Sequence, residues 1–310
     1  MVAVCTHQHR GYSSVQIIGL NTLELVINRV WYFAAKKNKV KERIAEALRS
    51  GLGRRSDGRS VEFRVLSPIK LRGMTTAAEA MSALRQLENH YQAENLGWFF
   101  KTGPGEYGEG DKFLGLRVPQ TRDISKKFID LSQDQISILL DSEYHEDRQL
   151  GLFILVLQFK RTKDLEVRGQ IFNFYLTEAR RGRVNNWDLV DATAPYLGAY
   201  LVETNNLQPI WDLAKEDSLW LKRISVLLTF AFLKAKDEAP TYEIAEYHLH
   251  HPHDLMHKAV GWMLREMGKF NLKALTGFLE KHYSEMPRTM LRYAIEKLPE
   301  PERKAWLNRH

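Results

Sequence analysis

The sequence predicts an all-α protein built from stacked two-helix repeats. Beyond residue 74 the apolar residues recur at helical spacing, and the alternating apolar–polar pattern of a strand is rare. Glycine and proline are sparse and fall mainly between the helical stretches. Arg148, Trp187, Arg223 and Trp262 are separated by 39, 36 and 39 positions. This spacing is the period of a two-helix repeat in which each unit packs on its neighbours.

The elements can be assigned in order along this repeat. Residues at matching places in stacked units would line one shared groove. The glycine-rich segment 103–110 is expected to be a loop joining the first helices, since it lacks the Gly-Lys-Ser/Thr ending of a phosphate loop. The clearest helical stretches are Ser132–Leu140, Gln149–Phe159, Gln170–Ala179 and Leu272–His282. The second helices of the repeats are expected to begin near His145, Asn186, Leu219, Asp254 and Met286.

Trp187 and Asp191 are four residues apart, so a helix places an aromatic face and a carboxylate side by side. On a continuous helix Ala194 and Gly198 extend the same face and leave it uncrowded. Such a face suits a cationic centre held against a π-surface beside a negative charge. The alternative is a core tryptophan followed by an acid near a helix N-terminus.

The segment Leu255–Phe270 predicts a helix whose tryptophan stands on the basic side. The apolar side carries Met256, Val260, Met263, Leu264 and Met267. The opposite side carries Lys258, Trp262, Arg265 and Lys269. Basic residues around a tryptophan suit nucleic acid, with charges for phosphates and a ring for stacking. The alternative is a half-buried tryptophan at the edge of the repeats among ordinary solvated charges.

Two arginines are harder to interpret. Arg223 lies in Leu219–Leu233, which is apolar almost all round, so its charge needs a partner. Either a carboxylate from another repeat or a ligand phosphate would serve. Arg148, in a helix's first turn, is either a phosphate contact or a surface residue.

Several stretches together carry a resemblance to a known family. In order along the chain they are Phe113–Pro119, His145–Arg148, Asn185–Asp191, Leu219–Arg223, Lys258–Glu266 and Met286–Tyr293. With these the chain resembles the AlkD family of DNA alkylation repair glycosylases, which are built from HEAT-like helical repeats. The resemblance covers most of residues 74–310. It implies a HEAT-like two-helix repeat solenoid, an α-α superhelix with a concave DNA-binding groove.

The resemblance also implies roles for individual residues. The catalytic aspartate falls on Asp191, the two lesion-flanking tryptophans on Trp187 and Trp262, and the groove arginine on Arg223. Arg265 falls on a further DNA-contacting arginine. With the other basic residues of these stretches, the expected DNA contacts are Arg148, Lys222, Lys258, Arg265, Lys269, Arg288 and Arg292.

The implied activity is that of a monofunctional DNA glycosylase in base-excision repair. It would hydrolyse the N-glycosidic bond of cationic N3- or N7-alkylated purines in double-stranded DNA, without a base-flipping pocket. The lesion's positive charge makes the base a good leaving group, and a carboxylate stabilises the oxocarbenium-like sugar and positions water. One alternative is a non-catalytic repeat protein that binds damaged or distorted DNA. Another is a solenoid scaffold for protein partners.

The first 73 residues form a separate region. They hold 14 Lys and Arg against five Asp and Glu, a net charge of +9, so residues 74–310 carry −2 of the chain's +7. Our preferred interpretation is that the protein starts at Met74 and the preceding region is a mis-assigned extension. The alternative is a genuine basic arm, with an amphipathic helix within residues 21–52, that adds salt-sensitive affinity for DNA. Residues 74–310 must then gather their positive charges on one surface.

Composition limits the remaining classes. A hydrophobic content of 44% with 27% charged residues describes a soluble globular chain, and no apolar run is long enough for a membrane helix. Cys5 is the only cysteine, so disulfides are excluded and a cytoplasmic, nucleoid-associated monomer is expected. The histidines of 248–253 match no zinc spacing and are expected to form a polar loop. We expect no metal or other cofactor.

Overall fold

The structure, a computed structural model, describes residues 6–9, 12–15 and 75–309. Contacts between Cα atoms divide the chain into two units, Met1–Pro68 and Ile69–His310. In the first unit strand β1 (Thr6–His9) pairs antiparallel with β2 (Tyr12–Val15). The helix expected within residues 21–52 lies outside the described residues, as does the boundary expected at residue 74.

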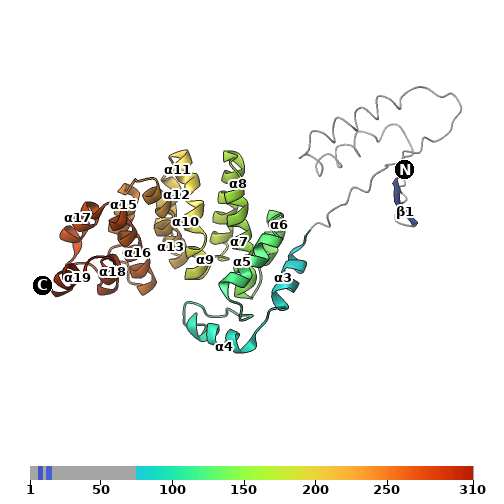
Figure 1. Cartoon of the computed structure of the whole chain (residues 1–310), viewed down its shortest axis with the longest axis horizontal. Coiled ribbons are helices and arrows are strands. Elements are labelled where there is room, and N and C mark those ends of the chain that lie inside the picture. Colours follow the sequence, from blue (N-terminus) through green and yellow to red (C-terminus); the bar gives the residue numbers. More distant parts are fainter. Residues whose placement is uncertain (1–5, 10–11, 16–74, 310) are drawn as a thin grey trace, which may run out of the picture. The chain divides into compact units, whose positions relative to one another are not determined.

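The second unit is a series of helices joined by short turns, and its described residues contain no strand (Figure 1). This confirms the predicted all-α solenoid. The helices are α3 (Ala77–Arg85), α4 (His90–Phe99), α5 (Val118–Lys127), α6 (Gln133–Leu140), α7 (His145–Arg161), α8 (Leu165–Arg180), α9 (Trp187–Asp191), α10 (Ala194–Leu197), α11 (Ala199–Thr204), α12 (Gln208–Lys215), α13 (Leu219–Leu228), α14 (Phe230–Lys234), α15 (Ala239–Tyr247), α16 (Asp254–Phe270), α17 (Leu272–His282), α18 (Arg288–Ala294) and α19 (Glu300–Asn308).

The second helices of successive repeats pack against one another along the stack. The helices α7, α9 with α10, α13 with α14, α16 and α18 contact each other in this order, and we call them the second-helix row. Four of their expected starts are confirmed, because helices begin at His145, Leu219 and Asp254, and Asn186 caps α9. The fifth begins at Arg288, two residues later than expected.

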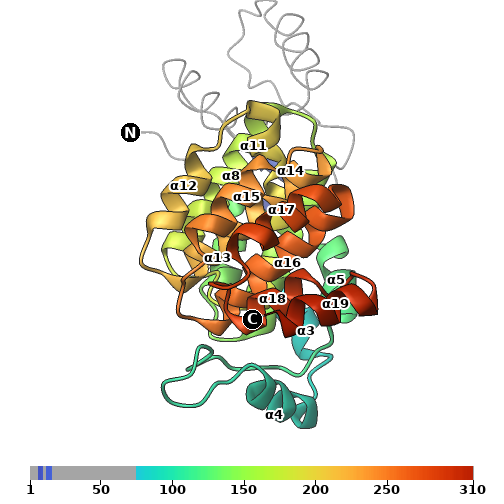
Figure 2. The same ribbon diagram turned by 90° about the vertical axis from the view of Figure 1, so that its left-hand side faces the viewer.

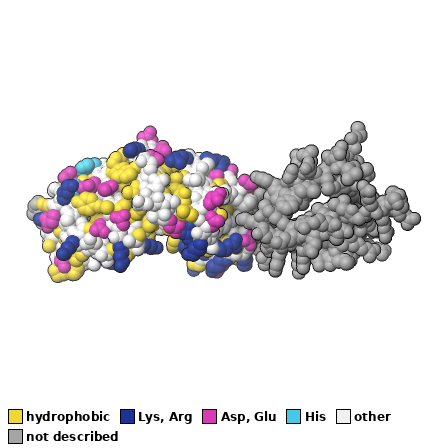
Figure 3. Space-filling model, turned by 90° about the horizontal axis from the view of Figure 1, so that it is seen from above, with side chains coloured by type: hydrophobic (Ala, Val, Ile, Leu, Met, Phe, Trp, Pro, Cys, Tyr) yellow, Lys and Arg dark blue, Asp and Glu magenta, His cyan; other side chains and the backbone are white. Residues whose placement is uncertain are grey.

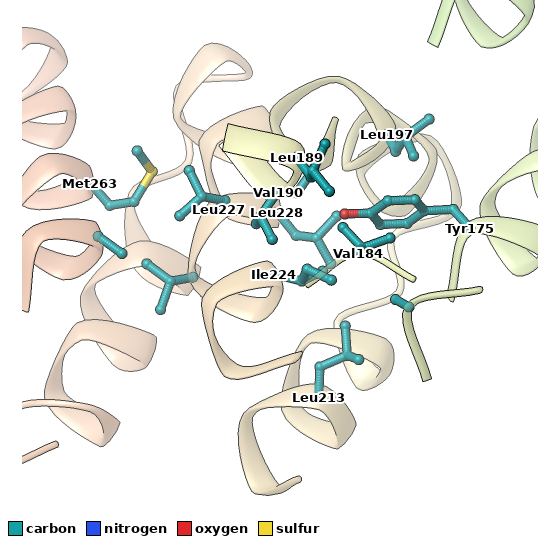
Figure 4. Packing of buried hydrophobic residues seen from close by; sticks show 14 of the residues in the cluster. Tyr175, Val184, Leu189, Val190, Leu197, Leu213, Ile224, Leu227, Leu228 and Met263 are labelled. Carbon is teal, nitrogen blue, oxygen red and sulfur yellow. The ribbon is translucent and has the colours of Figure 1, made fainter. Parts of the chain in front are cut away.

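A continuous apolar core joins the repeats. Its buried members extend from Ala77 to Ile295 without a break between helices. Figure 4 shows Tyr175 of α8 reaching toward Leu189 and Val190 of α9. The Tyr175 ring is fully buried, and its hydroxyl oxygen lies 3.0 Å from that of Thr193. Helix α9 is therefore fixed from behind by the preceding repeat.

The expected long helix from Asn186 to Gly198 is interrupted. Helix α9 ends at Asp191, because Thr193 leaves the helical region at φ −123° and ψ −59° and Pro195 follows in the next turn. The expected groove face extending through Ala194 and Gly198 is therefore wrong. Ala194 is fully buried, and a Cβ on Gly198 would lie 2.5 Å from the Leu228 carbonyl oxygen. These small residues allow α10 to approach α13 and α14 closely.

A buried carboxylate holds the segment between α4 and α5 against α7. Glu146 accepts hydrogen bonds from the backbone N–H groups of Leu114, Gly115 and Leu116 at 2.9, 2.9 and 3.1 Å. Gly115 has φ +84°, and a Cβ there would lie 2.1 Å from the Asn89 carbonyl oxygen. Two of the motifs behind the family resemblance are thus explained by folding. Figure 2, an end-on view, shows α4 and the following loop projecting from the stack.

Candidate functional site

Asp191 and Arg223 form a bidentate ion pair between neighbouring repeats. Arg223 Nε donates to Asp191 Oδ1 at 2.9 Å, and Nη2 donates to Oδ2 at 2.8 Å. The third guanidinium nitrogen, Nη1, donates to the Leu255 carbonyl oxygen of α16 at 2.5 Å. Arg223 therefore connects α9, α13 and α16. Of the two partners considered for Arg223, a carboxylate from another repeat is the one present.

The environment of Asp191 leaves its carboxylate sheltered but reachable. Its side chain is 19% exposed, whereas that of Arg223 is 4% exposed. Burial raises the pKa of Asp191 above its ordinary value of 3.8, and this outweighs the lowering by Arg223. The nearby Asp188 carboxylate raises that pKa further. The carboxylate oxygens retain lone pairs beyond those used by Arg223.

Trp187 lies in an aromatic cluster at the start of α9. Its ring stacks on Phe100 with centroids 5.4 Å apart and planes at 19°, and Phe99 meets it edge-on at 6.1 Å. The Tyr107 hydroxyl accepts a hydrogen bond from the Trp187 indole. The ring is half-buried. Trp187 is thus held in one orientation by the segment between α4 and α5, an arrangement typical of neither a core nor a solvated residue.

Trp262 lies on α16, on the other side of α13 from α9. Its indole nitrogen donates to Glu266 Oε1 at 3.1 Å, and its ring lies 6.5 Å from that of Phe230. The ring is half-buried. The two faces predicted for this helix are confirmed, because the residues assigned to its apolar side are buried: Met256, Val260, Met263, Leu264 and Met267.

The charges on the basic side of α16 are largely paired. Lys258 Nζ lies 2.7 Å from Asp254 Oδ2, Lys269 Nζ lies 2.7 Å from Glu266 Oε1, and Arg265 pairs with Glu296. This face therefore carries fewer free cations than its sequence suggests.

The remaining expected DNA contacts differ in their availability. Arg288 is exposed and donates to the Leu307 carbonyl oxygen at 2.9 Å. Lys222 and Arg292 have no carboxylate partner among the described residues. The face seen from above in Figure 3 carries basic and acidic side chains together, so charge is not segregated on that face.

Arg148 is neither a surface residue nor available to a phosphate as placed. It is 5% exposed, and its Nη2 donates to Asp111 Oδ1 at 2.6 Å. Its Nη1 donates to the Ser142 carbonyl oxygen at 2.9 Å. Although Arg148 belongs to the first turn of α7, that turn is covered by the segment between α4 and α5. The expected DNA contact at Arg148 therefore has no support in this geometry.

A buried histidine that sequence reasoning did not assign to the site joins α7 to α9. His145 Nε2 lies 2.8 Å from Asp188 Oδ2, and Nδ1 lies 3.3 Å from Asp111 Oδ2. Burial favours the neutral imidazole, but the two carboxylates raise the pKa of His145 from 6.5 to about 9. The ring also stacks on Phe113 at 4.9 Å. The sequence signal was a run of charged residues opening an otherwise apolar helix.

Tyr107 is the second functional candidate that the sequence did not reveal. Besides Trp187, its ring meets Trp220 edge-on at 6.1 Å, and Lys258 lies close enough to lower its pKa. Burial nevertheless raises that pKa overall. The loop between α4 and α5 thus brings a phenol between the first turns of α9, α13 and α16. A single aromatic residue among glycines gave no sequence signal for this placement.

The histidine-rich segment before α16 serves local structure. His253 caps the helix, its Nδ1 accepting from the Leu255 N–H at 3.1 Å. His248 is buried, and this burial lowers its pKa to about 4. Among the described residues no group of three or more His, Cys, Asp and Glu side chains is placed to hold a metal ion. In the same part of the chain, no helix has the length and apolar character required to cross a bilayer.

Comparisons with known proteins agree on one family. The family model for the DNA alkylation repair enzyme matches residues 80–298. A solved structure described as a predicted DNA alkylation repair enzyme from Enterococcus faecalis superposes with a TM-score of 0.56. The two chains are 16% identical, and the match covers 69% of this chain and 97% of that one. At this identity the structural likeness shows the fold alone. No curated protein matches the chain.

Proposed function

The chain belongs to the DNA alkylation repair enzyme family, and we propose that it is a monofunctional DNA glycosylase acting on cationic N3- or N7-alkylated purines. The observation that carries this proposal is the Asp191 carboxylate, sheltered yet 19% exposed and oriented through two hydrogen bonds by Arg223. A fixed negative charge in a partly desolvated site suits a reaction in which positive charge develops on a sugar.

Asp191 acts on the deoxyribose. As the bond between C1′ and the alkylated purine breaks, the bonding electrons pass to the base, which leaves neutral, and positive charge moves onto the sugar. The carboxylate stabilises this charge and accepts a proton from the water that adds to C1′. The products are the free base and an abasic site. The bidentate pair holds the carboxylate still, so little reorganisation accompanies the charge movement.

The aromatic residues support the same step. Trp187, held by Phe100 and the Tyr107 hydroxyl, presents a π-surface four residues before Asp191. Trp262 presents a second one from α16. Such surfaces attract a cationic nucleotide and strengthen as charge shifts to the sugar. Among the basic residues, Lys222, Arg288 and Arg292 are the best available phosphate contacts, with Lys258, Arg265 and Lys269 exchanging a carboxylate for a phosphate.

Release of 7-methylguanine and 3-methyladenine from methylated duplex DNA tests the proposal. We expect the chain to release both bases and leave an uncleaved abasic strand, and Asp191→Asn to lose this activity. Asp212→Asn, on the exposed part of α12, is the matched control. Release that survives in Asp191→Asn would place the catalytic group elsewhere. Tight binding to methylated or abasic duplex without any release would establish the non-catalytic DNA-binding alternative.

A further inference from the structure

A second cluster of basic residues lies at the opposite end of the second-helix row from Asp191. Lys160 stands in the last turn of α7 and Lys234 ends α14. Both ammonium groups approach one aromatic ring, that of Tyr196 on α10, with Nζ at 3.4 and 5.7 Å from its centroid. Arg122 of α5 is their neighbour, because its charge acts on Lys160. We call Arg122, Lys160 and Lys234 the far-end cluster.

None of these three cations has a carboxylate partner in the described part of the chain. All three side chains are exposed. Elsewhere the basic residues of the second-helix row are paired, as Arg223 is with Asp191 and Lys258 with Asp254. Burial together with the like charges of Arg122 and Lys234 lowers the pKa of Lys160, and no acidic group contributes. Unrelieved repulsion among converging cations is expected where an anion binds.

The surface beside Tyr196 is also shaped to receive a group. A cavity of about 300 Å³ lies there, and its charged lining residues are Lys160, Lys163, Arg168 and Lys234. Of these only Arg168 has a carboxylate partner, Glu203, among the described residues. Attraction of a lysine to a helix C-terminus explains one cation at the end of one helix. It does not explain why cations from three helices converge on one ring without an acid.

We propose that the far-end cluster is a phosphate-binding site that holds the backbone of duplex DNA at a distance from the reacting nucleotide. This deepens the proposed function and rests on it for the identity of the polymer. Helix α7 sets the spacing, since Lys160 follows His145 by fifteen residues, roughly 22 Å at 1.5 Å per residue. That length corresponds to about six phosphate steps along one strand.

Salt-dependent binding of the full-length chain to an unmodified duplex tests the site. We expect Lys160→Gln/Lys234→Gln to reduce the slope of log affinity against log salt by about 0.9 for each phosphate that the variant no longer neutralises. The affinity at low salt should fall roughly tenfold. Lys215→Gln/Lys273→Gln removes the same charge from exposed lysines of α12 and α17 and should leave the slope unchanged. Lys160→Arg/Lys234→Arg should restore it.

Three results separate the outcomes. Equal slopes for the far-end and control variants would overturn the proposal. If inorganic phosphate binds the unmodified chain but not the far-end variant, and the DNA slopes are equal, the site holds free phosphate and not DNA. Binding to unmodified duplex needs no turnover, so this test stands even if no base is released. Where release is measurable, the far-end variant should raise KM and leave kcat unchanged.

Discussion

The two ends of the second-helix row treat positive charge in opposite ways. At the N-terminal end each central cation has a carboxylate: Arg223 has Asp191, Arg148 has Asp111, and His145 lies between Asp111 and Asp188. At the C-terminal end the cations of the far-end cluster share one aromatic ring and have no carboxylate among the described residues. Paired charges fix the geometry that a reaction needs, and unpaired charges remain free to attract phosphates.

The largest expected effect comes from removing the carboxylate at the paired end. Asp191→Asn should lower the rate of base excision by about 10²- to 10³-fold, because the amide cannot balance positive charge on the sugar. Affinity for unmodified duplex, which depends on phosphate contacts, should change little. Single-turnover excision and duplex binding on the same samples measure both. A variant that lost binding and kept its excision rate would reverse the roles assigned to the two ends.

Removing the partner of that carboxylate should alter both stability and pH dependence. Asp191 must be ionised to act, so excision falls as pH falls through its pKa, which lies above 3.8 in the folded chain. Arg223→Gln removes the main lowering influence, so the acid limb should move to higher pH. It should also cost about 3 to 5 kcal/mol of unfolding free energy, because Asp191 is left unpaired. An unchanged acid limb, recorded where the variant is still folded, would assign it to another group.

The histidine between Asp111 and Asp188 offers a test by stability alone. Its pKa is about 9 when folded and 6.5 otherwise, so its stabilisation is complete below pH 6.5 and is lost as the pH rises through about 9. This corresponds to on the order of 3 kcal/mol. Unfolding of the chain and of His145→Gln should therefore converge with rising pH. Parallel curves between pH 6 and pH 10 would show that His145 is neutral.

A smaller effect is expected from the aromatic support of the site. Trp187→Ala should slow excision of cationic purines roughly tenfold, since it removes a π-surface worth about 1 kcal/mol or more. Trp187→Phe keeps a ring and should recover most of the rate. Comparing a cationic and a neutral lesion separates charge recognition from general packing. Equal losses on both substrates would indicate that Trp187 only supports α9.

The smallest expected effect concerns the first 73 residues, which hold a net charge of +9. We propose that residues 74–310 carry the activity, so removing residues 1–73 should leave the excision rate unchanged. If the segment is part of the native protein, its removal should weaken only the salt-sensitive binding. Mass spectrometry of the native N-terminus distinguishes the cases, because a peptide spanning residue 74 would reject a start at Met74.

Much of the fold was predictable because helical periodicity is local. The apolar pattern placed Leu272–His282 at the observed bounds, and the need for a partner at Arg223 followed from its apolar helix. Contacts between distant segments were not predictable. Nothing local indicates that Asp111 would bury Arg148, or that Tyr107 would reach Trp187 from a glycine-rich loop. The break after Asp191 was not predicted, because small residues suit an uncrowded exposed face as well as close packing between helices.

That break gives Asp191 an unusual mechanical position. Helix α9 has only five residues, too few to persist by its own hydrogen bonds. Its shape depends on Tyr175 behind it, Arg223 beside it and the aromatic cluster before it. Local melting of α9 should therefore precede global denaturation. On warming, we expect excision to fade reversibly while circular dichroism still reports an intact solenoid, and the amides of α9 to exchange with deuterium sooner than those of α7.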